Sequence, residues 1–365
     1  MPGAFSLARL MRAVELVSSQ LRVQGCVTVL FLAVIFSSKV TACSCSISSR
    51  SLCGGRGETR KKPLMLIWAP PYGVKFDFND CKKYYDITSC DLTYDRSLYE
   101  QADAVLFFQR NIYSLGHMPQ GPRPPLQKWI WYHLESPSNT RRIPRIDNIF
   151  NLTLSYRRDA DITTRFNIVI NNEPNENFVL PKKDKLVCWI VSNKATRGTG
   201  DRMAYYEELI KHIEVHVFGL AFARPLPPER YYETMESCKF YLAFENSAHR
   251  DYFTEKVNGP LSSGTVPIVL GPTRDNYEEY IPADAFIHVN DFPSAKALAH
   301  HLLDLDQDHQ RYLQYFRWRR FYSARPHLLT VRNLFTQPTC LTCDYISRDH
   351  QYSVVHDLYG WYFSY

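Results

Sequence analysis

The chain has 365 residues, of which 45% are hydrophobic and 14% aromatic, so it is long enough for two packed domains. Its formal net charge of +6 is small for this length, because 43 Lys and Arg residues are offset by 37 Asp and Glu residues. This balance argues against a nucleic-acid-binding protein, whereas a mild basic excess suits a substrate that carries a diphosphate.

The first 40 residues contain a predicted membrane signal. Arg9, Arg12 and Arg22 precede an apolar run from Cys26 to Phe36. Positive charge before such a run favours the cytoplasm for that side, which would place the rest of the chain in a lumen. We therefore predict a cytoplasmic tail at 1–20, a transmembrane anchor at 21–40 and a flexible stem at 41–62. The run is short for a span, so a cleaved signal peptide is the alternative.

The body of the chain divides into two parts with different patterns. Residues 63–180 hold strand candidates at 64–68, 105–108 and 129–133, separated by Tyr-rich and Pro-rich segments. Residues 181–330 alternate strands at 186–191, 215–218, 240–244, 266–270 and 285–289 with helices at 202–213, 229–237, 251–263 and 294–304. This alternation predicts a doubly wound sheet that binds its ligand at the carboxyl ends of the strands. Residues 331–365 lack the alternation, and we expect them to return to the first domain.

One stretch of the second part concentrates polar residues between two apolar strands. It runs from Cys238 to Gly271 and reads CKFYLAFENSAHRDYFTEKVNGPLSSGTVPIVLG. A strand, a helix and a strand in about thirty residues predict a βαβ unit. Tyr252, Glu255 and Lys256 are spaced to share one face of the helix, and together suit a flat ring, a sugar hydroxyl and a phosphate. Gly259-Pro260 predicts a bend or a restart of this helix.

The segment FYLAFENSAHRDYFTEK, followed by GTVPIVLGP, resembles the signature of the α-1,3-fucosyltransferases. That family moves fucose from GDP-fucose onto N-acetyllactosamine-type glycans, and a weaker resemblance extends from about residue 63 to the C-terminus. The resemblance implies an α/β fold of the GT-B type, with two Rossmann-like domains facing a central cleft. The acceptor would bind to 63–180 and GDP-fucose to 181–330. The resemblance also implies a single-pass type II Golgi membrane enzyme, with a homodimer as one option for assembly.

Transfer from a nucleotide sugar needs a base for the acceptor hydroxyl and a cation for the diphosphate. Arg202, which the pattern places at the start of a helix, and Lys256 are the predicted diphosphate clamp. Glu135 ends an aromatic strand in the segment WYHLESP and matches the L-E-S-P segment that carries the family's catalytic base. The further predicted donor contacts are Ser192, Asn193, Tyr241, Glu245, Asn246, Tyr252 and Glu255.

The acceptor is predicted to meet the segment Gln109-Arg110-Asn111-Ile112, which resembles the family's H-H-[RW]-D-I segment. In the family, Trp at this position accompanies 1,4 transfer to type 1 chains and Arg accompanies 1,3 transfer to type 2 chains. A Trp offers a flat apolar face to a sugar, whereas an Arg offers charged donors to hydroxyls. Arg110 therefore predicts 1,3 transfer to Galβ1-4GlcNAc, with Tyr72 as a second acceptor contact. The alternative is that Arg110 only pairs with an acid on the surface.

Two other functions are kept as alternatives. Asp159-Ala-Asp161 matches the DxD pattern that binds Mn²⁺ in GT-A glycosyltransferases, so a metal-dependent GT-A transferase is one alternative. Arg202 and Lys256 make a metal redundant, and we predict neither a metal nor another cofactor. A non-catalytic Golgi relative that binds a glycan or a nucleotide is the second alternative. The chain also has Arg165-Phe166-Asn167 where the family often has Tyr-Gly near the fucose.

Six of the ten cysteines lie in the body, and an even count in a lumenal chain predicts disulfides. Cys340-Leu-Thr-Cys343 resembles half of a zinc site, but the sequence offers no partner motif. The resemblance implies the pairs Cys81–Cys340, Cys90–Cys343 and Cys188–Cys238. Asn151-Leu-Thr153 is the single N-x-S/T sequon in the chain and predicts an N-linked glycan.

Overall fold

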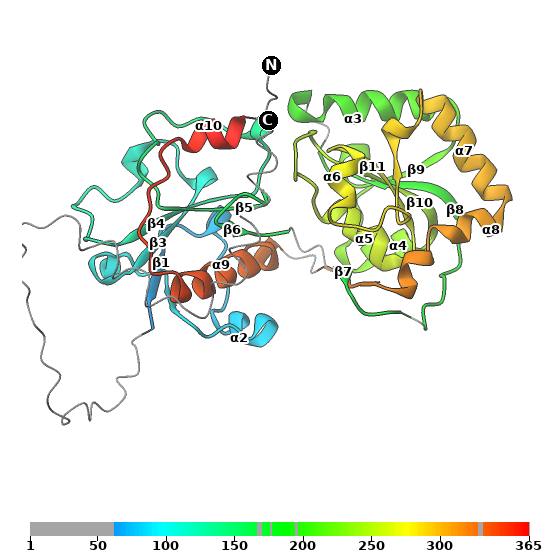
Figure 1. The fold of residues 1–365 in the computed structure, drawn as a ribbon. Helices are drawn as coiled ribbons and strands as arrows, with labels where there is room; N and C mark the ends of the chain where they lie inside the picture. The colour runs from blue at the N-terminus through cyan, green and yellow to red at the C-terminus, as the bar shows by residue number, and fades with distance from the viewer. Residues whose placement is uncertain (1–61, 166–169, 176, 194–195, 328–330, 365) are drawn as a thin grey trace, which may run out of the picture. The chain divides into compact units, whose positions relative to one another are not determined.

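The computed structural model describes residues 62–364, apart from 166–169, 176, 194–195 and 328–330. The predicted tail and anchor, and the stem up to residue 61, therefore lie outside the described residues. The described residues belong to one compact unit, Arg60–Tyr365, which contains two parallel sheets (Figure 1). None of the helices in this part of the chain is both long enough and apolar enough to span a membrane.

The strands form two larger sheets and one small one. The strands are β1 (Leu64–Ile67), β2 (Asp91–Thr93), β3 (Ala104–Phe108), β4 (Lys128–His133), β5 (Leu152–Ser155), β6 (Ile162–Thr163), β7 (Ile170–Asn171), β8 (Lys185–Ile190), β9 (Val215–Phe218), β10 (Cys238–Phe244), β11 (Val266–Leu270), β12 (Ile287–His288) and β13 (Ser323–Ala324). The first sheet has the order β2-β1-β3-β4-β5-β6 and the second β12-β11-β10-β8-β9, while β7 and β13 pair antiparallel.

The helices connect and cover these sheets. The α-helices are α2 (Asn79–Tyr85), α3 (Thr196–Leu209), α4 (Tyr231–Glu236), α5 (Glu255–Ser263), α6 (Arg274–Glu278), α7 (Ala295–Gln307), α8 (His309–Gln314), α9 (Val331–Arg348) and α10 (Leu358–Phe363). Short 3₁₀ turns lie at Pro71–Gly73, Arg96–Gln101, Gln109–Asn111, Leu115–His117, Pro137–Asn139, Leu220–Phe222, Pro228–Arg230, Val289–Asp291 and Arg317–Arg320. We call the first sheet with α2, α9 and α10 the first lobe, and the second sheet with α3 to α8 the second lobe.

The first lobe has an apolar core that the end of the chain completes. Every residue of β3 and β4 is buried, as expected for strands that are covered on both faces. Phe335 of α9 and Tyr362 of α10 join the same core. Two disulfides, Cys81–Cys340 and Cys90–Cys343, attach α9 to α2 and to the residue before β2. In Figure 1, α9, near the red end of the colour bar, lies beside the blue and cyan elements of this lobe.

The second lobe is a sheet with helices on both faces. Side chains of β10 alternate between the two cores, because successive residues of a strand point to opposite faces. Phe240, Leu242 and Phe244 pack into the core that α3 and α7 cover, whereas Tyr241 and Ala243 pack into the core that α4 and α5 cover. The third disulfide, Cys188–Cys238, joins β8 to β10. The three disulfides are the pairs that the sequence resemblance implies, and the doubly wound α/β class is confirmed.

Two predicted helix starts are wrong, and both corrections concern the site. Helix α3 begins at Thr196, so Arg202 lies inside the helix and not in its first turn. Helix α5 begins at Glu255, because the chain first turns at Asp251, whose φ of 62° is left-handed. Tyr252 therefore precedes the helix and does not share a helical face with Glu255. In this turn the Asp251 N–H donates to Oδ1 of Asn276 at 2.6 Å, and the Asn276 amide donates back to Oδ1 of Asp251 at 2.9 Å.

Of the predicted bend or restart at Gly259-Pro260, the restart does not occur, since α5 runs without interruption to Ser263. Gly259 permits close contact with α4, because a Cβ atom there would lie 2.9 Å from the hydroxyl of Tyr231. The predicted strand at 285–289 shortens to β12, because the chain turns at Val289–Asp291 and the His288 ring accepts from the Asn290 N–H.

Asn151, the predicted site of an N-linked glycan, lies in a buried position. This side chain is only 2% exposed. Its amide nitrogen donates to the carbonyl of Ser353 at 2.5 Å, and its oxygen accepts from the N–H of Trp129 at 2.8 Å. Attachment of a sugar to that nitrogen would break the hydrogen bond to Ser353. The sequon indicated exposure, but the return of the C-terminal residues to the first lobe covers it.

Candidate active site

A cavity of about 420 Å³ lies at the carboxyl ends of β8 and β10. The predicted donor contacts among its lining residues are Ser192, Asn193, Arg202, Tyr241, Asn246, Glu255 and Lys256. Two others, Glu245 and Tyr252, do not line it. Leu226, Pro228 and Tyr231 also line it and were not predicted, because they come from a loop, a 3₁₀ turn and the start of α4, none of which carries a polar motif.

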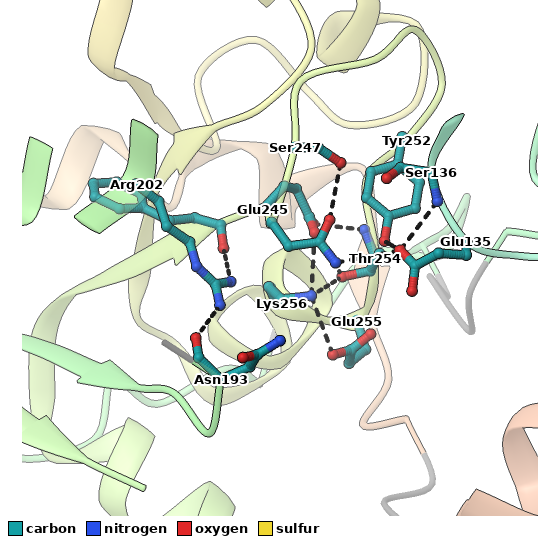
Figure 2. A network of polar contacts seen from close by, with 12 residues as sticks. Glu135, Ser136, Asn193, Arg202, Glu245, Ser247, Tyr252, Thr254, Glu255 and Lys256 are labelled. Atoms are coloured by element: carbon teal, nitrogen blue, oxygen red, sulfur yellow. Dashed lines mark hydrogen bonds and ion pairs between the residues drawn. The ribbon is translucent and has the colours of Figure 1, made fainter. Parts of the chain in front are cut away.

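Lys256 is held on the cavity wall by two carboxylates and a hydroxyl (Figure 2). Its Nζ lies 3.1 Å from Oε2 of Glu245 and 3.5 Å from Oε1 of Glu255, and it donates to Oγ1 of Thr254 at 2.6 Å. Burial lowers the pKa of Lys256, but the two carboxylates outweigh burial and raise the pKa above its ordinary value. The side chain therefore stays cationic and is oriented before any ligand arrives.

Glu245 lies behind Lys256 and supports it. Its Oε1 accepts from the backbone N–H of Thr254 at 2.7 Å, and both of its oxygens lie 3.0 Å from the Thr254 hydroxyl. Burial raises the pKa of Glu245, although Lys256 opposes this effect. For Glu255, burial likewise favours the neutral form, but Lys256 and His327 outweigh it and hold its pKa below the ordinary value. Glu255 thus offers an ionised acceptor to a hydroxyl in the cavity.

Arg202 is the second cation at this cavity and is 4% exposed. Its guanidinium donates to the carbonyls of Asn193 at 2.7 Å and of Phe244 at 3.4 Å, which follow β8 and end β10. Its Nε has no partner among the described residues. Burial lowers the pKa of Arg202, and the nearby Glu245 carboxylate opposes this effect without reversing it. Arg202 thus holds two strand ends together and contributes positive charge to the cavity, although it does not lie at a helix N-terminus.

Glu135 lies two residues after β4, and its carboxylate connects the lobes. Oε1 accepts from the hydroxyl of Tyr252 at 2.7 Å, from the N–H of Ser136 at 3.0 Å and from the amide of Asn246 at 3.3 Å. Oε2 lies 2.6 Å from Nη2 of Arg110. The Glu135 side chain is 20% exposed, so a substrate hydroxyl can reach it. Figure 2 shows Tyr252 and Ser136 around this carboxylate.

A second cavity, of about 550 Å³, lies beside Glu135 on the first lobe. It is lined by Tyr72, Gln109, Arg110, Asn111, Ile112, Tyr113, His133, Asn139, Thr140 and Arg141. Tyr72 and Tyr113 are 54% and 59% exposed, so their aromatic rings are available to the apolar face of a sugar. Tyr72 has a left-handed φ of 52°, which is unusual for a residue with a side chain and marks local strain.

Some residues of the site have no signal in the sequence. Tyr113 and Arg141 line the second cavity from loops, and His327 approaches Glu255 from a distant segment. Ser136 and Thr254 are different, because each is adjacent to a predicted site residue. The backbone N–H of Ser136 donates to Glu135, and the N–H and hydroxyl of Thr254 donate to Glu245. These hydrogen bonds depend on the geometry of the turns, which the spacing of the motif does not specify.

The two carboxylates of the DxD motif contact different residues. Asp159 accepts from Arg157 at 2.8 and 2.6 Å, whereas Asp161 accepts from the N–H and hydroxyl of Thr153 at 2.8 and 2.7 Å. The two carboxylates are thus committed to separate structural contacts. Across the described ranges, no group of three His, Cys, Asp or Glu residues is arranged to hold a metal. Of the segment at 165–167, Arg165 lies over the ring of Tyr280, and the rest falls outside the described residues.

The sequence matches two family models that together span most of the chain. Residues 60–167 match the model described as "Fucosyltransferase, N-terminal", and residues 180–361 match "Glycosyltransferase family 10 (fucosyltransferase) C-term". The chain is 43% identical over 301 residues to 4-galactosyl-N-acetylglucosaminide 3-alpha-L-fucosyltransferase 9 of Homo sapiens, covering 82% of each chain. It is 41% identical over 297 residues to 4-galactosyl-N-acetylglucosaminide 3-alpha-L-fucosyltransferase FUT6 of Pan troglodytes, covering 80% of each.

Solved structures support the fold. A crystal structure of an alpha1,3-fucosyltransferase with GDP-fucose superposes with a TM-score of 0.53 at 16% identity, covering 84% of this chain and 96% of the other. A second, with GDP, gives a TM-score of 0.51 at 14% identity, with coverage of 83% and 94%. The two-lobed arrangement of parallel sheets is therefore of the GT-B type, which excludes a GT-A fold.

Proposed function

Because the chain belongs to glycosyltransferase family 10, the fucosyltransferases, we propose that it transfers L-fucose from GDP-fucose to a lactosamine-type glycan. The acceptor position is the 3-hydroxyl of GlcNAc, and the products are of the Lewis x type. The names of the curated relatives, which specify 3-α-L-fucosyl transfer to 4-galactosyl-N-acetylglucosaminides, support this choice.

The contacts of Glu135 carry the proposal. Asn246, which lines the 420 Å³ cavity, donates to Oε1 of this carboxylate, and Arg110, which lines the 550 Å³ cavity, pairs with Oε2. One ionisable group is therefore in contact with a wall of each cavity. A transferase needs its base at this location, because the acceptor hydroxyl and the anomeric carbon of the donor must meet there.

The chemistry is a single displacement. The 3-hydroxyl oxygen of GlcNAc attacks C1 of fucose on the face opposite the diphosphate, so the configuration at C1 inverts. The O–C1 bond forms, the C1–O bond to the β-phosphate breaks, and its electron pair leaves with GDP. The hydroxyl proton passes to Glu135 and from there to solvent. Lys256 and Arg202 stabilise the charge that develops on the leaving diphosphate, and no metal is assigned to this step.

The donor occupies the 420 Å³ cavity. Lys256 is the proposed point charge on the diphosphate, and Arg202 is the second cation. Glu255, which is ionised, accepts from a ribose or fucose hydroxyl. Ser192, Asn193 and Tyr241 line the remaining wall. Tyr241 donates to the carbonyl of Ile190 at 3.3 Å, so it contributes its ring more than its hydroxyl.

The acceptor occupies the 550 Å³ cavity. Arg110 and Tyr72 lie together there, with the guanidinium carbon 5.9 Å from the centre of the tyrosine ring. An Arg at this position offers charged donors to sugar hydroxyls, which supports 1,3 transfer to Galβ1-4GlcNAc.

We also propose a Golgi location with the catalytic part in the lumen. Arg9, Arg12 and Arg22 before the apolar run of residues 26–36 support this orientation, as does the presence of three disulfides in the body. Protease protection of the full chain in microsomes tests the topology: only the N-terminal tail is expected to be cleaved.

The deciding experiment is an activity assay on a secreted form that begins near residue 61. GDP-fucose and Galβ1-4GlcNAc are supplied, and the product is analysed for an α-1,3-linked fucose. Turnover is the expected result. GDP binding without turnover by the wild type would favour the non-catalytic, nucleotide-binding alternative. Failure to bind GDP would contradict both of these and leave only a glycan-binding relative.

A further inference from the structure

The two oxygens of the Glu135 carboxylate have different surroundings. Oε1 accepts three hydrogen bonds, from the Tyr252 hydroxyl, the Ser136 N–H and the Asn246 amide. Within the described part of the chain, Oε2 has one partner, Nη2 of Arg110. A carboxylate has about four lone-pair sites, two on each oxygen. Oε1 is therefore fully occupied, whereas Oε2 keeps a lone pair.

Arg110 also shows which way Oε2 faces. The arginine lines the 550 Å³ cavity while it contacts Oε2 at 2.6 Å, so this oxygen lies on the side of that cavity. On the premise of the proposed function, we propose that Tyr252 is a positioning residue for the base. Its hydroxyl fixes Oε1 of Glu135, so that Oε2 takes the proton of the acceptor hydroxyl. The proton moves from the hydroxyl to Oε2 as the O–C1 bond forms.

Tyr252 is well suited to hold a carboxylate. Its side chain is 3% exposed, and its ring packs edge-on against Tyr156 at 5.1 Å. Burial, followed by the charges of Glu135 and Glu245, raises the pKa of Tyr252 well above its ordinary value. The hydroxyl therefore keeps its proton near neutral pH and remains a donor to the carboxylate. Such a group orients the base without competing for the acceptor proton.

The backbone around Tyr252 is fixed on both sides. The N–H of Asp251 donates to Asn276 at 2.6 Å, and the N–H of Thr254 donates to Glu245 at 2.7 Å. Lys256 follows two residues later and lines the other cavity. One short segment of the second lobe thus holds both the proposed diphosphate cation and the base of the first lobe. Tyr252 does not line the 420 Å³ cavity, so this role replaces the direct donor contact that the sequence predicted.

The test is Tyr252→Phe, which removes the hydroxyl and keeps the ring packed against Tyr156. Loss of a hydrogen bond to a charged group predicts a kcat lower by about 10- to 100-fold. The acid limb of the pH–rate profile should move to higher pH, because the carboxylate loses a donor that favours its ionised form. The KM for GDP-fucose and the affinity for GDP should change by less than about twofold. A purely structural role would not move the pH profile.

Tyr277→Phe is the matched control. Tyr277 is as buried as Tyr252 and lies in the same lobe, but its hydroxyl has no partner among the described residues. Its kcat and pH profile should equal those of the wild type. A double-mutant cycle adds Glu135→Gln. If Tyr252 acts through Glu135, Tyr252→Phe should lower the rate of Glu135→Gln by no more than about twofold.

Four outcomes would overturn the inference, and they are distinguishable. If the losses in kcat of Tyr252→Phe and Glu135→Gln multiply in the double mutant, Tyr252 does not act through Glu135. A lower kcat of Tyr252→Phe with an unmoved acid limb of the pH–rate profile would show the same. Neither result would contradict fucosyl transfer itself. A kcat equal to that of the wild type would likewise refute only the positioning role. Absence of fucosyl transfer by the wild type would refute the proposed function and this inference with it. GDP affinity measured by calorimetry confirms that each variant is folded.

Discussion

Arg110 and Glu135 form an ion pair, with Nη2 of the arginine 2.6 Å from Oε2 of the glutamate. Their side chains are 36% and 20% exposed, so the pair is open to a ligand and not sealed in the core. The sequence left two roles open for Arg110, an acceptor contact or a partner of a surface acid. The arginine does pair with an acid, but that acid is the proposed base. Acceptor orientation and proton transfer are therefore expected to change together when Arg110 is replaced.

The first prediction concerns regiochemistry. The wild type should use Galβ1-4GlcNAc better than Galβ1-3GlcNAc by about tenfold or more, a difference of roughly 1.4 kcal/mol in transition-state binding. Arg110→Trp should reduce this preference and also lower kcat, because it removes the cation beside Glu135. Arg110→Lys, which keeps the charge, is the control. Linkage analysis of the products measures the outcome, and equal use of both acceptors by the wild type would contradict the assignment.

The second prediction concerns the base. Glu135→Gln should lower kcat by roughly 10²–10⁴-fold, because an amide cannot accept the hydroxyl proton. The affinity for GDP should be unchanged, since Glu135 does not line the 420 Å³ cavity. Glu229→Gln, on the exposed surface, serves as the control. Steady-state kinetics and calorimetry check both statements, and a wild-type kcat in the Gln variant would place the base elsewhere.

The third prediction concerns Lys256. Lys256→Ala should weaken GDP binding severely and also lower stability by about 1–3 kcal/mol, because it leaves the buried Glu245 without its cation. Lys239→Ala is the matched control, since Lys239 pairs with Asp306 at 2.5 Å and lies outside the cavity. The Lys239→Ala variant should be less stable than the wild type but should bind GDP with the same affinity. The two effects are separated by calorimetry and thermal unfolding, and recovery of Lys256→Ala activity by Mn²⁺ would argue against the metal-free clamp.

The fourth prediction concerns pH and stability. Burial, helped by Arg110, lowers the pKa of His133 to about 3, from 6.5 in the unfolded chain. Between these two pKa values, His133 is protonated in the unfolded chain but neutral in the folded chain. The contribution of His133 to the free energy of unfolding is therefore fully present above pH 6.5, and it is lost as the pH falls towards 3. In His133→Gln, the melting temperature should fall less steeply over that window. His300→Gln, at an exposed position, should follow the wild type.

The fifth prediction concerns Asn151. Its buried hydrogen bonds predict that the lumenal form carries no N-linked glycan, so treatment with a peptide-N-glycosidase should leave its mass unchanged. Asn151→Asp should destabilise the fold by about 1–3 kcal/mol, because Ser353 loses its donor. A mass shift after enzyme treatment would mean that the first lobe folds differently around this residue.

The pattern of residues was sufficient to predict the general architecture. Strands such as 215–218 and 266–270 were located to the residue, because short apolar runs bounded by turn residues have few other structures. Helix starts were less accurate, as α3 and α5 show, because the residue at which a helix begins depends on side-chain contacts. Before α5, Asp251 contacts Asn276, which lies 25 residues later in the chain, and Arg158, which lies 93 residues earlier.

The sequence by itself determined the α/β class, the polar residues at the strand ends and, through the resemblance, the family. These features are local, since each depends on neighbours within a few residues. Only the tertiary structure decided that Tyr252 and Asn246 hold Glu135, that Glu245 supports Lys256 from behind, and that Asn151 is covered. Tyr252 and Asn246 lie 117 and 111 residues from Glu135 in the sequence, and Ser353 lies 202 residues from Asn151. Hydrogen bonds between such distant residues exist only after the lobes and the C-terminal helices have packed.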